Sequence, residues 1–257
     1  MTRIALAGAT GRMGHAIAQV IDEDPLVTLV AAHGGDDDPR LGQKVGEVTV
    51  TKLGALDADV VIDFTSPAGT RAVIERCAAA KCALVSGTTG LGEDEFAALD
   101  ALAEEVPVVW APNMSVGVTL LFHLAELATK LVGPDFDPEI VEMHHRHKVD
   151  APSGTAVRLA ERVAAGRGLD PSEAVVHGRS GQVGPRRDDE IGVMTLRGGS
   201  VVGDHTLVLA GPGERLEIGH RAQDRSIFAR GAVRAARWVV ERPPGRYDMA
   251  DVLGIER

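Results

Sequence analysis

Several residue types that mark common protein classes are scarce in this sequence. Aromatic residues make up only 3% of the 257 residues, which argues against base-stacking platforms and aromatic cages. The only thiols are Cys77 and Cys82, and a pair of reduced, packed cysteines is their simplest interpretation. No apolar run is long enough to cross a bilayer, and the N-terminal residues lack a signal-peptide pattern. We therefore expect a folded cytoplasmic protein that has no membrane partner.

Positive charge is also in short supply, because the formal net charge is −10. Recognition of nucleic acid requires a basic face that neutralises phosphates, so we expect no nucleic-acid partner. A small anion can still bind where local cations overcome the overall field. The hydrophobic content of 44% is sufficient for one large domain or two modest ones.

The first half of the chain alternates β-rich runs with helical patterns. Strands are predicted at residues 3–7, 27–32, 60–64, 83–86 and 108–111, and helices at residues 13–22, 68–80 and 93–104. This alternation is typical of βαβ units. It predicts an α/β fold with a Rossmann-type, doubly wound parallel sheet.

The pattern changes after Asn113. We predict a helix at residues 116–131, a strand at 139–145, a helix from about Ser153, antiparallel strands within 191–222 and a last helix at 226–241. Residues 182–190 are charged and rich in turn formers, so we expect a solvated surface loop. These elements predict a second α+β domain with a mixed sheet. The expected boundaries are residues 1–114, completed by 225–257, for the first domain and 115–224 for the second.

A glycine-rich turn, GATGRMG, occupies residues 8–14 between the first predicted strand and the first predicted helix. Glycines permit a tight turn and a close approach of backbone to phosphate, and the helix start then offers N–H groups to a pyrophosphate. The motif alone is also compatible with a plain β-to-α turn. The further βαβ units favour dinucleotide binding.

The second predicted strand ends without the acidic residue that usually holds the adenosine ribose of a dinucleotide. His33, Gly34 and Gly35 stand there instead, followed by residues 36–38, which are all aspartate. These aspartates are candidates for ribose binding or ordinary loop charges, and Arg12 and Arg40 are possible phosphate partners. The choice between NAD and NADP stays open.

The stretch EMHHRHKVDAPSGTA, residues 142–156, concentrates the titratable chemistry of the chain. A metal site is disfavoured, because adjacent histidines on a strand point to opposite faces and no cysteine or HExxH pattern assists them. A solvated strand edge is a second interpretation. The third combines Lys148 with the small residues of APSGT at a helix start, which form an anion clamp beside histidines able to transfer a proton. Together with a nicotinamide, such a clamp describes a reductase.

These motifs resemble the dihydrodipicolinate (4-hydroxy-tetrahydrodipicolinate) reductase family. The resemblance covers essentially the whole chain and rests on GATGRMG, VIDFTSPAGT, VSGTTG, APNMSVG, EMHHRHKVDAPSGTA and the late run GDHTLVLAGPGERLEIGHRAQDRSIFARGAV. It implies NADH- or NADPH-dependent reduction of a small cyclic dicarboxylate in the diaminopimelate route to lysine. It also implies a dinucleotide-binding first domain, a substrate-binding and oligomerising second domain, a homotetramer and no metal.

The resemblance further implies individual roles. His144 and Lys148 would be catalytic, and His145, Gly154 and Thr155 would bind substrate. The implied cofactor residues are Gly8, Ala9, Thr10, Gly11, Arg12, Met13, Gly34, Gly87, Thr88, Thr89, Ala111, Pro112, Asn113 and Met114. The family often carries an acid and an arginine where this chain has Gly34 and Gly35, and no role is implied for Arg146 or His147. A non-catalytic NAD(P)-binding redox sensor and a metal-dependent lyase are the alternatives.

Overall fold

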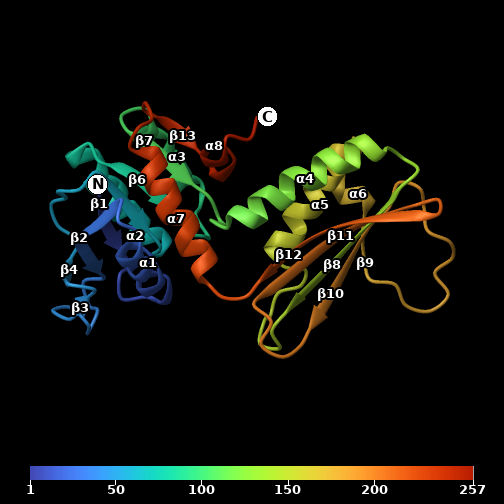
Figure 1. Ribbon diagram of the computed structural model, residues 1–257, viewed down its shortest axis with the longest axis horizontal. Helices are drawn as coiled ribbons and strands as arrows, with labels where there is room; N and C mark the ends of the chain where they lie inside the picture. Colours follow the sequence, from blue (N-terminus) through green and yellow to red (C-terminus); the bar gives the residue numbers. More distant parts are fainter. Residues whose placement is uncertain (257) are drawn as a thin grey trace. The chain divides into compact units, whose positions relative to one another are not determined.

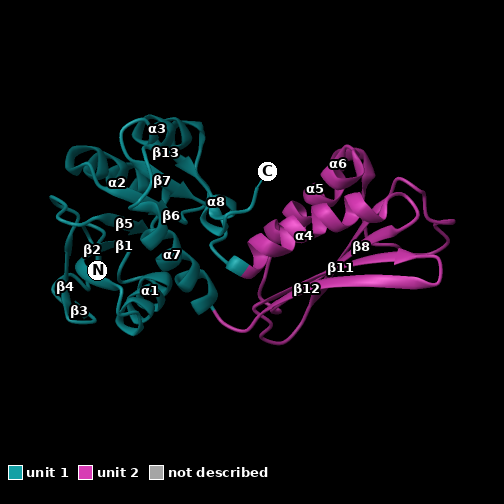
Figure 2. Ribbon diagram, turned by 45° about the horizontal axis from the view of Figure 1, so that its top comes forward, with its two compact units in different colours: residues 1–116, 225–257 teal, residues 117–224 magenta. Residues whose placement is uncertain are grey.

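The computed structural model describes residues 1–256 and divides the chain into two compact units (Figure 2). Unit 1 comprises Met1–Val116 and the chain from Arg225 onward, and unit 2 comprises Gly117–Asp224. Within the described residues, no helix is both long and apolar enough to cross a membrane.

Unit 1 is built on a sheet whose strand order is β13-β7-β6-β5-β1-β2-β4-β3 (Figure 1). Its strands are β1 (Thr2–Ala7), β2 (Val27–Gly34), β3 (Lys44–Val45), β4 (Val48–Lys52), β5 (Val60–Asp63), β6 (Ala83–Ser86), β7 (Pro107–Trp110) and β13 (Gly245–Tyr247). All neighbours pair in parallel except β3 and β4. The central strands are buried on both faces, as their continuous apolar runs require.

Helices cover both faces of this sheet. They are α1 (Arg12–Glu23), α2 (Pro67–Ala80), α3 (Glu93–Ala103), α7 (Ser226–Val239) and α8 (Met249–Leu253). Side chains of α1, α7 and α8 pack with one set of strand residues, including Ile4 and Ile62. Side chains of α2 and α3 pack with the alternate set, including Ala5 and Val61. Ser66 caps α2 through its side chain, with Pro67 in the first helical position, so the sequence itself specifies where α2 begins.

The strand order places a switch point between β1 and β5. The chain leaves β1 toward β2 on one side, whereas β5 pairs with β1 on the other. Open α/β sheets bind their ligands at the carboxyl ends of strands at such a point. The glycine-rich turn after β1 and the residues after β5 therefore lie where a ligand is expected.

Unit 2 is a five-stranded sheet in the order β12-β11-β8-β10-β9, with helices on one face (Figure 1). Its elements are α4 (Val116–Val132), β8 (Asp137–His144), α5 (Gly154–Arg167), α6 (Pro171–Ala174), β9 (Val175–His177), β10 (Ile191–Arg197), β11 (Gly203–Gly211) and β12 (Glu214–Ala222). Leu121 of α4, Leu159 of α5 and Ala174 of α6 pack on Ile140, Ile191 and Leu207 of the sheet.

The predicted fold class is confirmed: a parallel Rossmann-type sheet and a second, mixed sheet are both present. The antiparallel prediction for residues 191–222 is wrong for β10, which runs parallel to β8 and β9. Helix α5 separates β8 from β10 and supplies the crossover that parallel strands need. Burial alternates along a strand in either direction, so the pattern alone does not reveal the direction of pairing.

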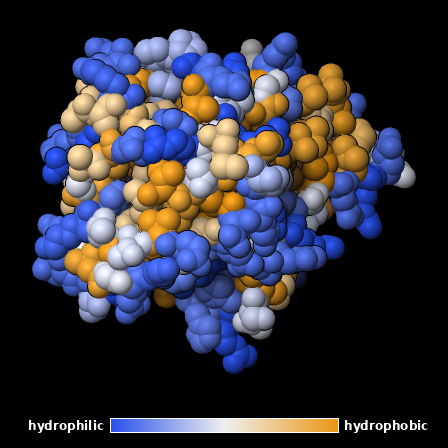
Figure 3. All heavy atoms as spheres, turned by 60° about the vertical axis from the view of Figure 1, so that its left-hand side comes forward, coloured by the Kyte–Doolittle hydropathy of each residue, from blue (hydrophilic) through white to orange (hydrophobic). Residues whose placement is uncertain are grey.

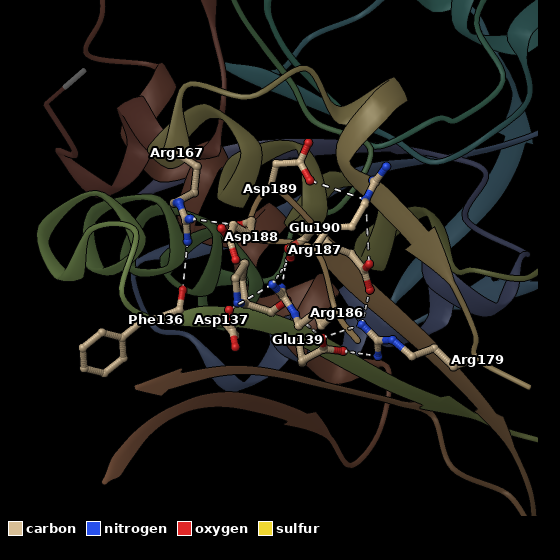
Figure 4. Close-up of polar contacts among 11 residues, drawn as sticks. Phe136, Asp137, Glu139, Arg167, Arg179, Arg186, Arg187, Asp188, Asp189 and Glu190 are labelled. Carbon is tan, nitrogen blue, oxygen red and sulfur yellow. Dashed lines mark hydrogen bonds and ion pairs between the residues drawn. The ribbon is translucent and has the colours of Figure 1, made fainter. Parts of the chain in front are cut away.

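The charged segment at residues 182–190 is mostly exposed, but hydrogen bonds and ion pairs connect it to strand β8 (Figure 4). Arg186 donates to the carboxylates of Asp137 and Glu139 on β8, at 2.9 and 3.0 Å. Arg179 forms a bidentate ion pair with Glu139, at 2.7 and 2.9 Å, and a single contact with one carboxylate oxygen of Glu190. The expectation of a merely solvated loop is therefore incomplete, because Arg186 is held by two carboxylates of β8.

Candidate active site

The glycine-rich turn after β1 packs so closely against neighbouring main-chain atoms that side chains would not fit at Gly8 and Gly14. Gly8 has a φ of 77°, and a Cβ at this residue would lie 2.7 Å from the carbonyl oxygen of Phe64. A Cβ at Gly14 would lie 2.3 Å from the carbonyl oxygen of Gly8. Helix α1 then begins at Arg12 without any side chain capping it, and its first turn holds no acidic residue. The start of α1 is therefore suited to a phosphate, because its N–H groups and dipole favour an anion.

The glycine-rich turn is joined to the loop after β2 by polar contacts. The backbone N–H groups of Gly8 and Ala9 both donate to the carbonyl of His33, at 3.0 Å. The hydroxyl of Thr10 donates to the carboxylate of Asp38, and Arg40 donates to the carbonyl of Thr10 at 2.6 Å. These contacts place Asp38 and Arg40 beside the predicted pyrophosphate loop.

Asp38 and Arg40 also form an ion pair with an Nε–Oδ1 distance of 2.8 Å. Hydrogen bonds from Arg40 and Thr10 hold the pKa of Asp38 well below its usual value. A Cβ at Gly34 would lie 3.4 Å from the Asp38 carboxylate. A carboxylate and a guanidinium, those of Asp38 and Arg40, are thus present beyond the end of β2, and a Cβ at residue 34 would meet Asp38 only in ordinary contact.

A buried carboxylate organises the turns after β5 and β6. Asp63 is 0% exposed, and it accepts hydrogen bonds from the hydroxyls of Thr65, Thr70, Ser86 and Thr88 at 2.6 to 3.1 Å. Asp63 was not among the residues predicted from the sequence, although an acid at a strand end followed by several hydroxyl residues is a usable signal. Asp63 fixes the start of the turn that contains Gly87, Thr88 and Thr89.

The remaining predicted cofactor residues follow β7. The N–H of Ala111 donates to the carbonyl of Ser86 at 3.2 Å, so this turn lies against the turn after β6. The side chain of Asn113 accepts from the N–H of Ser115 at 2.9 Å, Pro112 is exposed and Met114 is buried. The turns after β1, β6 and β7 therefore lie along the same carboxyl edge of the sheet.

In unit 2, His144 is the last residue of β8 and is bound to a buried carboxylate. Glu142 lies two residues earlier on the same face of the strand and is 0% exposed. The His144 Nδ1 to Glu142 Oε2 distance is 2.6 Å. Arg197 of β10 donates to both oxygens of Glu142, at 2.9 and 3.0 Å. Burial alone would raise the pKa of Glu142, but hydrogen bonds from Arg197, His144 and Ser153 outweigh it and lower that pKa.

The loop after β8 contains Lys148, which belongs to a network of hydrogen bonds and ion pairs. Its ammonium contacts both carboxylate oxygens of Asp150 at 2.8 Å, which lowers the pKa of Asp150. Arg197 also donates to the backbone carbonyl of Asp150, at 2.7 Å. Lys148 and His144 are thus connected through Asp150, Arg197 and Glu142.

The other basic residues of this loop differ in exposure. His145 is half-buried, and among residues 1–256 its Nδ1 has no hydrogen-bond partner. Arg146 and His147 form an exposed turn, in which the backbone N–H of Arg146 donates to the carbonyl of Gly199 at 3.3 Å and the ring of His147 lies 6.3 Å from that of His145. This placement provides no chemical role for either residue.

Helix α5 begins beside this cluster. Ser153 caps it by accepting from the N–H of Ala156 at 3.2 Å, and its own N–H donates to Glu142 at 3.1 Å. The N–H of Ser153 is therefore not available to an anion, whereas Gly154 is exposed, with open space around its Cα. Thr155 follows in the first turn. The structure brings this helix start together with β8 through the Ser153–Glu142 contact.

His205 of β11 adds a second imidazole to the cluster. Its Nε2 lies 3.0 Å from the hydroxyl of Ser153, and its ring packs edge-on against His144 with centroids 5.2 Å apart. Burial and the neighbouring His144 lower the pKa of His205 to about 4. Arg197 and His205 were not predicted as site residues, because they come from strands far along the chain. Glu142 was not predicted either, although it stands inside the basic motif. Within residues 1–256, no group of three or more His, Cys, Asp or Glu side chains is arranged to hold a metal ion.

Comparison with known proteins covers both units. Family models described as dihydrodipicolinate reductase, N-terminus and C-terminus, match residues 2–114 and 117–253. The 4-hydroxy-tetrahydrodipicolinate reductase of Alkalilimnicola ehrlichii is 51% identical over 99% of each chain. The enzyme of the same name from Chromohalobacter salexigens is 48% identical over 100% of each chain.

Solved structures show the same relationship. Dipicolinate-bound dihydrodipicolinate reductase from Paenisporosarcina sp. TG-14 has a TM-score of 0.79 and 26% identity over 98% of each chain. GenD2 from gentamicin A biosynthesis, in complex with NAD, has a TM-score of 0.60 at 15% identity over 99% of this chain and 90% of its own, a likeness of fold alone. The two family models together span nearly the whole sequence, so the resemblance carried by its motifs is confirmed and the chain belongs to the dihydrodipicolinate reductase family.

Proposed function

We propose that this protein reduces 4-hydroxy-tetrahydrodipicolinate to tetrahydrodipicolinate, with NADH or NADPH as the hydride donor, in the diaminopimelate route to lysine. The observation that supports this most is the unit-2 cluster, where His144, Lys148 and the start of α5 surround a single polar network. Membership of the family gives the same substrate class, since relatives of about 50% identity carry that name.

Unit 1 is the dinucleotide-binding domain in this proposal. The uncapped start of α1 and the glycines that permit the close turn fit a pyrophosphate, and the turns after β6 and β7 provide the nicotinamide end. Bound there, a dihydronicotinamide supplies the hydride. Asp38 is suited to the adenosine ribose and Arg40 to a 2′-phosphate, so both forms of the cofactor are accepted.

Unit 2 is the substrate-binding domain. Gly154 and Thr155, at the first turn of α5, bind one carboxylate of the substrate, and His145 contacts the ring. Lys148 holds the proton that the reaction consumes, His144 is the acid–base group beside it, and the leaving hydroxyl departs as water. The balance is one hydride and one proton taken up, with one water released. Lys148 and Arg197 are the cations of this site, and each is paired with a carboxylate of the chain.

Assembly and location are part of the same proposal. We infer a cytoplasmic homotetramer in which the sheets of unit 2 associate. Alternate residues of β8 and β11 are buried under helices, and those between them are only partly covered in the single chain. Light scattering coupled to size-exclusion chromatography tests the assembly, and a mass of one or two chains would contradict it.

Absorbance at 340 nm, followed with enzymatically generated substrate, tests the reaction. We expect NADH or NADPH to be consumed only when the dicarboxylate is present. Binding of the cofactor without its consumption would instead indicate a redox sensor. Activity that requires a metal and is abolished by a chelator would indicate a metal-dependent lyase.

A further inference from the structure

The unit-2 cluster contains a buried carboxylate to which the proposed reaction assigns no step. Glu142 is 0% exposed and accepts hydrogen bonds from four other residues. They come from the imidazole of His144, both terminal nitrogens of Arg197, the N–H of Ser153 and the hydroxyl of Thr195. An ionised carboxylate is costly to bury unless it is paired and fully hydrogen-bonded, and Glu142 meets both conditions.

We propose that Glu142 is a positioning residue that holds His144 as the Nδ1–H tautomer, and that Arg197 holds Glu142 in place. This inference rests on the proposed role of His144 in proton transfer. An ionised carboxylate only accepts hydrogen bonds, so the imidazole nitrogen that faces it, Nδ1, must carry a proton. The lone pair of the neutral ring is then on Nε2, which is the atom that exchanges a proton with the substrate.

The surroundings of Nε2 support this assignment. No hydrogen bond links it to any residue among 1–256, in contrast to Nδ1. A Cβ at residue 203 would lie 3.0 Å from Nε2, and Gly203 is the residue there. Gly203 does not adopt a positive φ, so space rather than backbone conformation explains the glycine. The absence of a side chain leaves Nε2 uncovered.

The charges around His144 are balanced in pairs. Arg197 neutralises Glu142, and Asp150 neutralises Lys148. His205, the nearest other imidazole, is neutral at neutral pH because burial lowers its pKa to about 4. Since Arg197 is itself held by the carbonyl of Asp150, the guanidinium is fixed from both sides. The carboxylate therefore cannot rotate away from His144 without leaving Arg197 unpaired.

Two-bond proton–nitrogen NMR of the histidine-labelled protein tests the tautomer directly. The His144 signals are assigned by comparison with His144→Gln. For the neutral ring of His144 we expect a protonated Nδ1 and an unprotonated Nε2 in the wild-type protein, and loss of this preference in Glu142→Gln, because an amide can either donate or accept. An Nε2–H tautomer in the wild type overturns the proposal, whether or not any variant folds.

Turnover separates positioning from a purely structural role. Glu142→Gln should lower kcat by about 10²-fold or more, with little change in KM, because general acid–base catalysis contributes about that factor. Glu139→Gln is the matched control, since Glu139 lies on the same strand and is also paired with arginines. We expect it to retain wild-type kcat and the wild-type His144 tautomer.

The two readouts also distinguish failure of the inference from failure of the proposed function. If wild-type protein reduces the dicarboxylate and folded Glu142→Gln does so equally fast, Glu142 is structural only. If wild-type protein reduces no dicarboxylate, the proposed function fails, whereas the NMR result still decides the tautomer.

Discussion

At the scale of residues, the two candidate sites are built from acids that fix other groups. Asp63 in unit 1 and Glu142 in unit 2 are both 0% exposed, and each carboxylate accepts several hydrogen bonds. Neither was selected from the sequence, although both stand inside motifs that were. A sequence shows which residue types are near each other along the chain, but not which hydroxyl or guanidinium folds back onto them from a distant strand.

Lys148 gives the first prediction. Lys148→Ala should lower kcat by about 10²-fold or more while leaving the dissociation constant for NADH nearly unchanged, because Lys148 belongs to unit 2. Lys130→Ala, an exposed lysine of α4, is the control and should behave as wild type. Steady-state rates and NADH fluorescence titration measure the two quantities. Wild-type turnover in Lys148→Ala would exclude its catalytic role.

Arg40 gives a prediction about the choice of cofactor. Arg40→Ala should weaken NADPH binding by at least about tenfold, since a charge-assisted hydrogen bond contributes about 1.5–3 kcal/mol. NADH, which lacks the 2′-phosphate, should be affected much less. Arg76→Ala removes an exposed charge elsewhere in unit 1 and should alter neither affinity. Equal losses for both cofactors would mean that Arg40 does not read the 2′-phosphate.

His205 gives a prediction about pH and stability. The unfolded chain protonates this histidine below about pH 6.5, whereas the folded protein excludes the proton until about pH 4. The stabilising effect is therefore complete above about pH 6.5 and is lost as pH falls toward 4, by up to about 3 kcal/mol. His205→Asn should lose less thermal stability over this interval than wild type. His177→Asn, at an exposed histidine, should follow wild type.

At the scale of elements, the repeated strand–helix units of unit 1 were predictable, whereas several short strands and helices were not. The predictions for α2 and β6 lie within about one residue of the observed ends, because caps, proline and turn residues fix them locally. The strands β3, β4, β9 and β13 were not predicted, since pairing with neighbouring strands rather than local sequence forms them. The short helices α6 and α8 were also not predicted, although Asp170 and Asp248 cap them. The direction of β10 was wrong for a related reason, because it depends on the crossover through α5.

The next prediction concerns the packing of helix α7 against the rest of unit 1. A Cβ at Gly231 would lie 1.7 Å from the carbonyl oxygen of Met114, so this glycine lets α7 pack against the turn after β7. Gly231→Ala should destabilise unit 1 by about 1–3 kcal/mol through overpacking. Arg234→Ala, at an exposed position of α7, is the control. If the free energy of unfolding of Gly231→Ala equals that of the wild type, the turn after β7 moves to accommodate the methyl group without loss of stability.

At the scale of the whole molecule, surface and charge agree with a protein that binds small anions at local sites. The face drawn in Figure 3 intersperses hydrophilic residues with several groups of hydrophobic ones, as is usual for a folded protein. Because the net charge is −10, the binding of a dicarboxylate and a dinucleotide depends on a few local cations and on helix N-termini. Those groups were visible in the sequence as motifs, whereas their partners were not.

The central claim is hydride transfer from a nicotinamide to the ring of the dicarboxylate, and isotope transfer tests it most directly. The substrate is generated enzymatically and mixed with wild-type protein and NADH deuterated at the transferable position of the ring, and the product is quenched early for mass spectrometry. We expect deuterium in the product in proportion to the NADH consumed. Oxidation of NADH without deuterium in the product, or no oxidation with either NADH or NADPH, would contradict it.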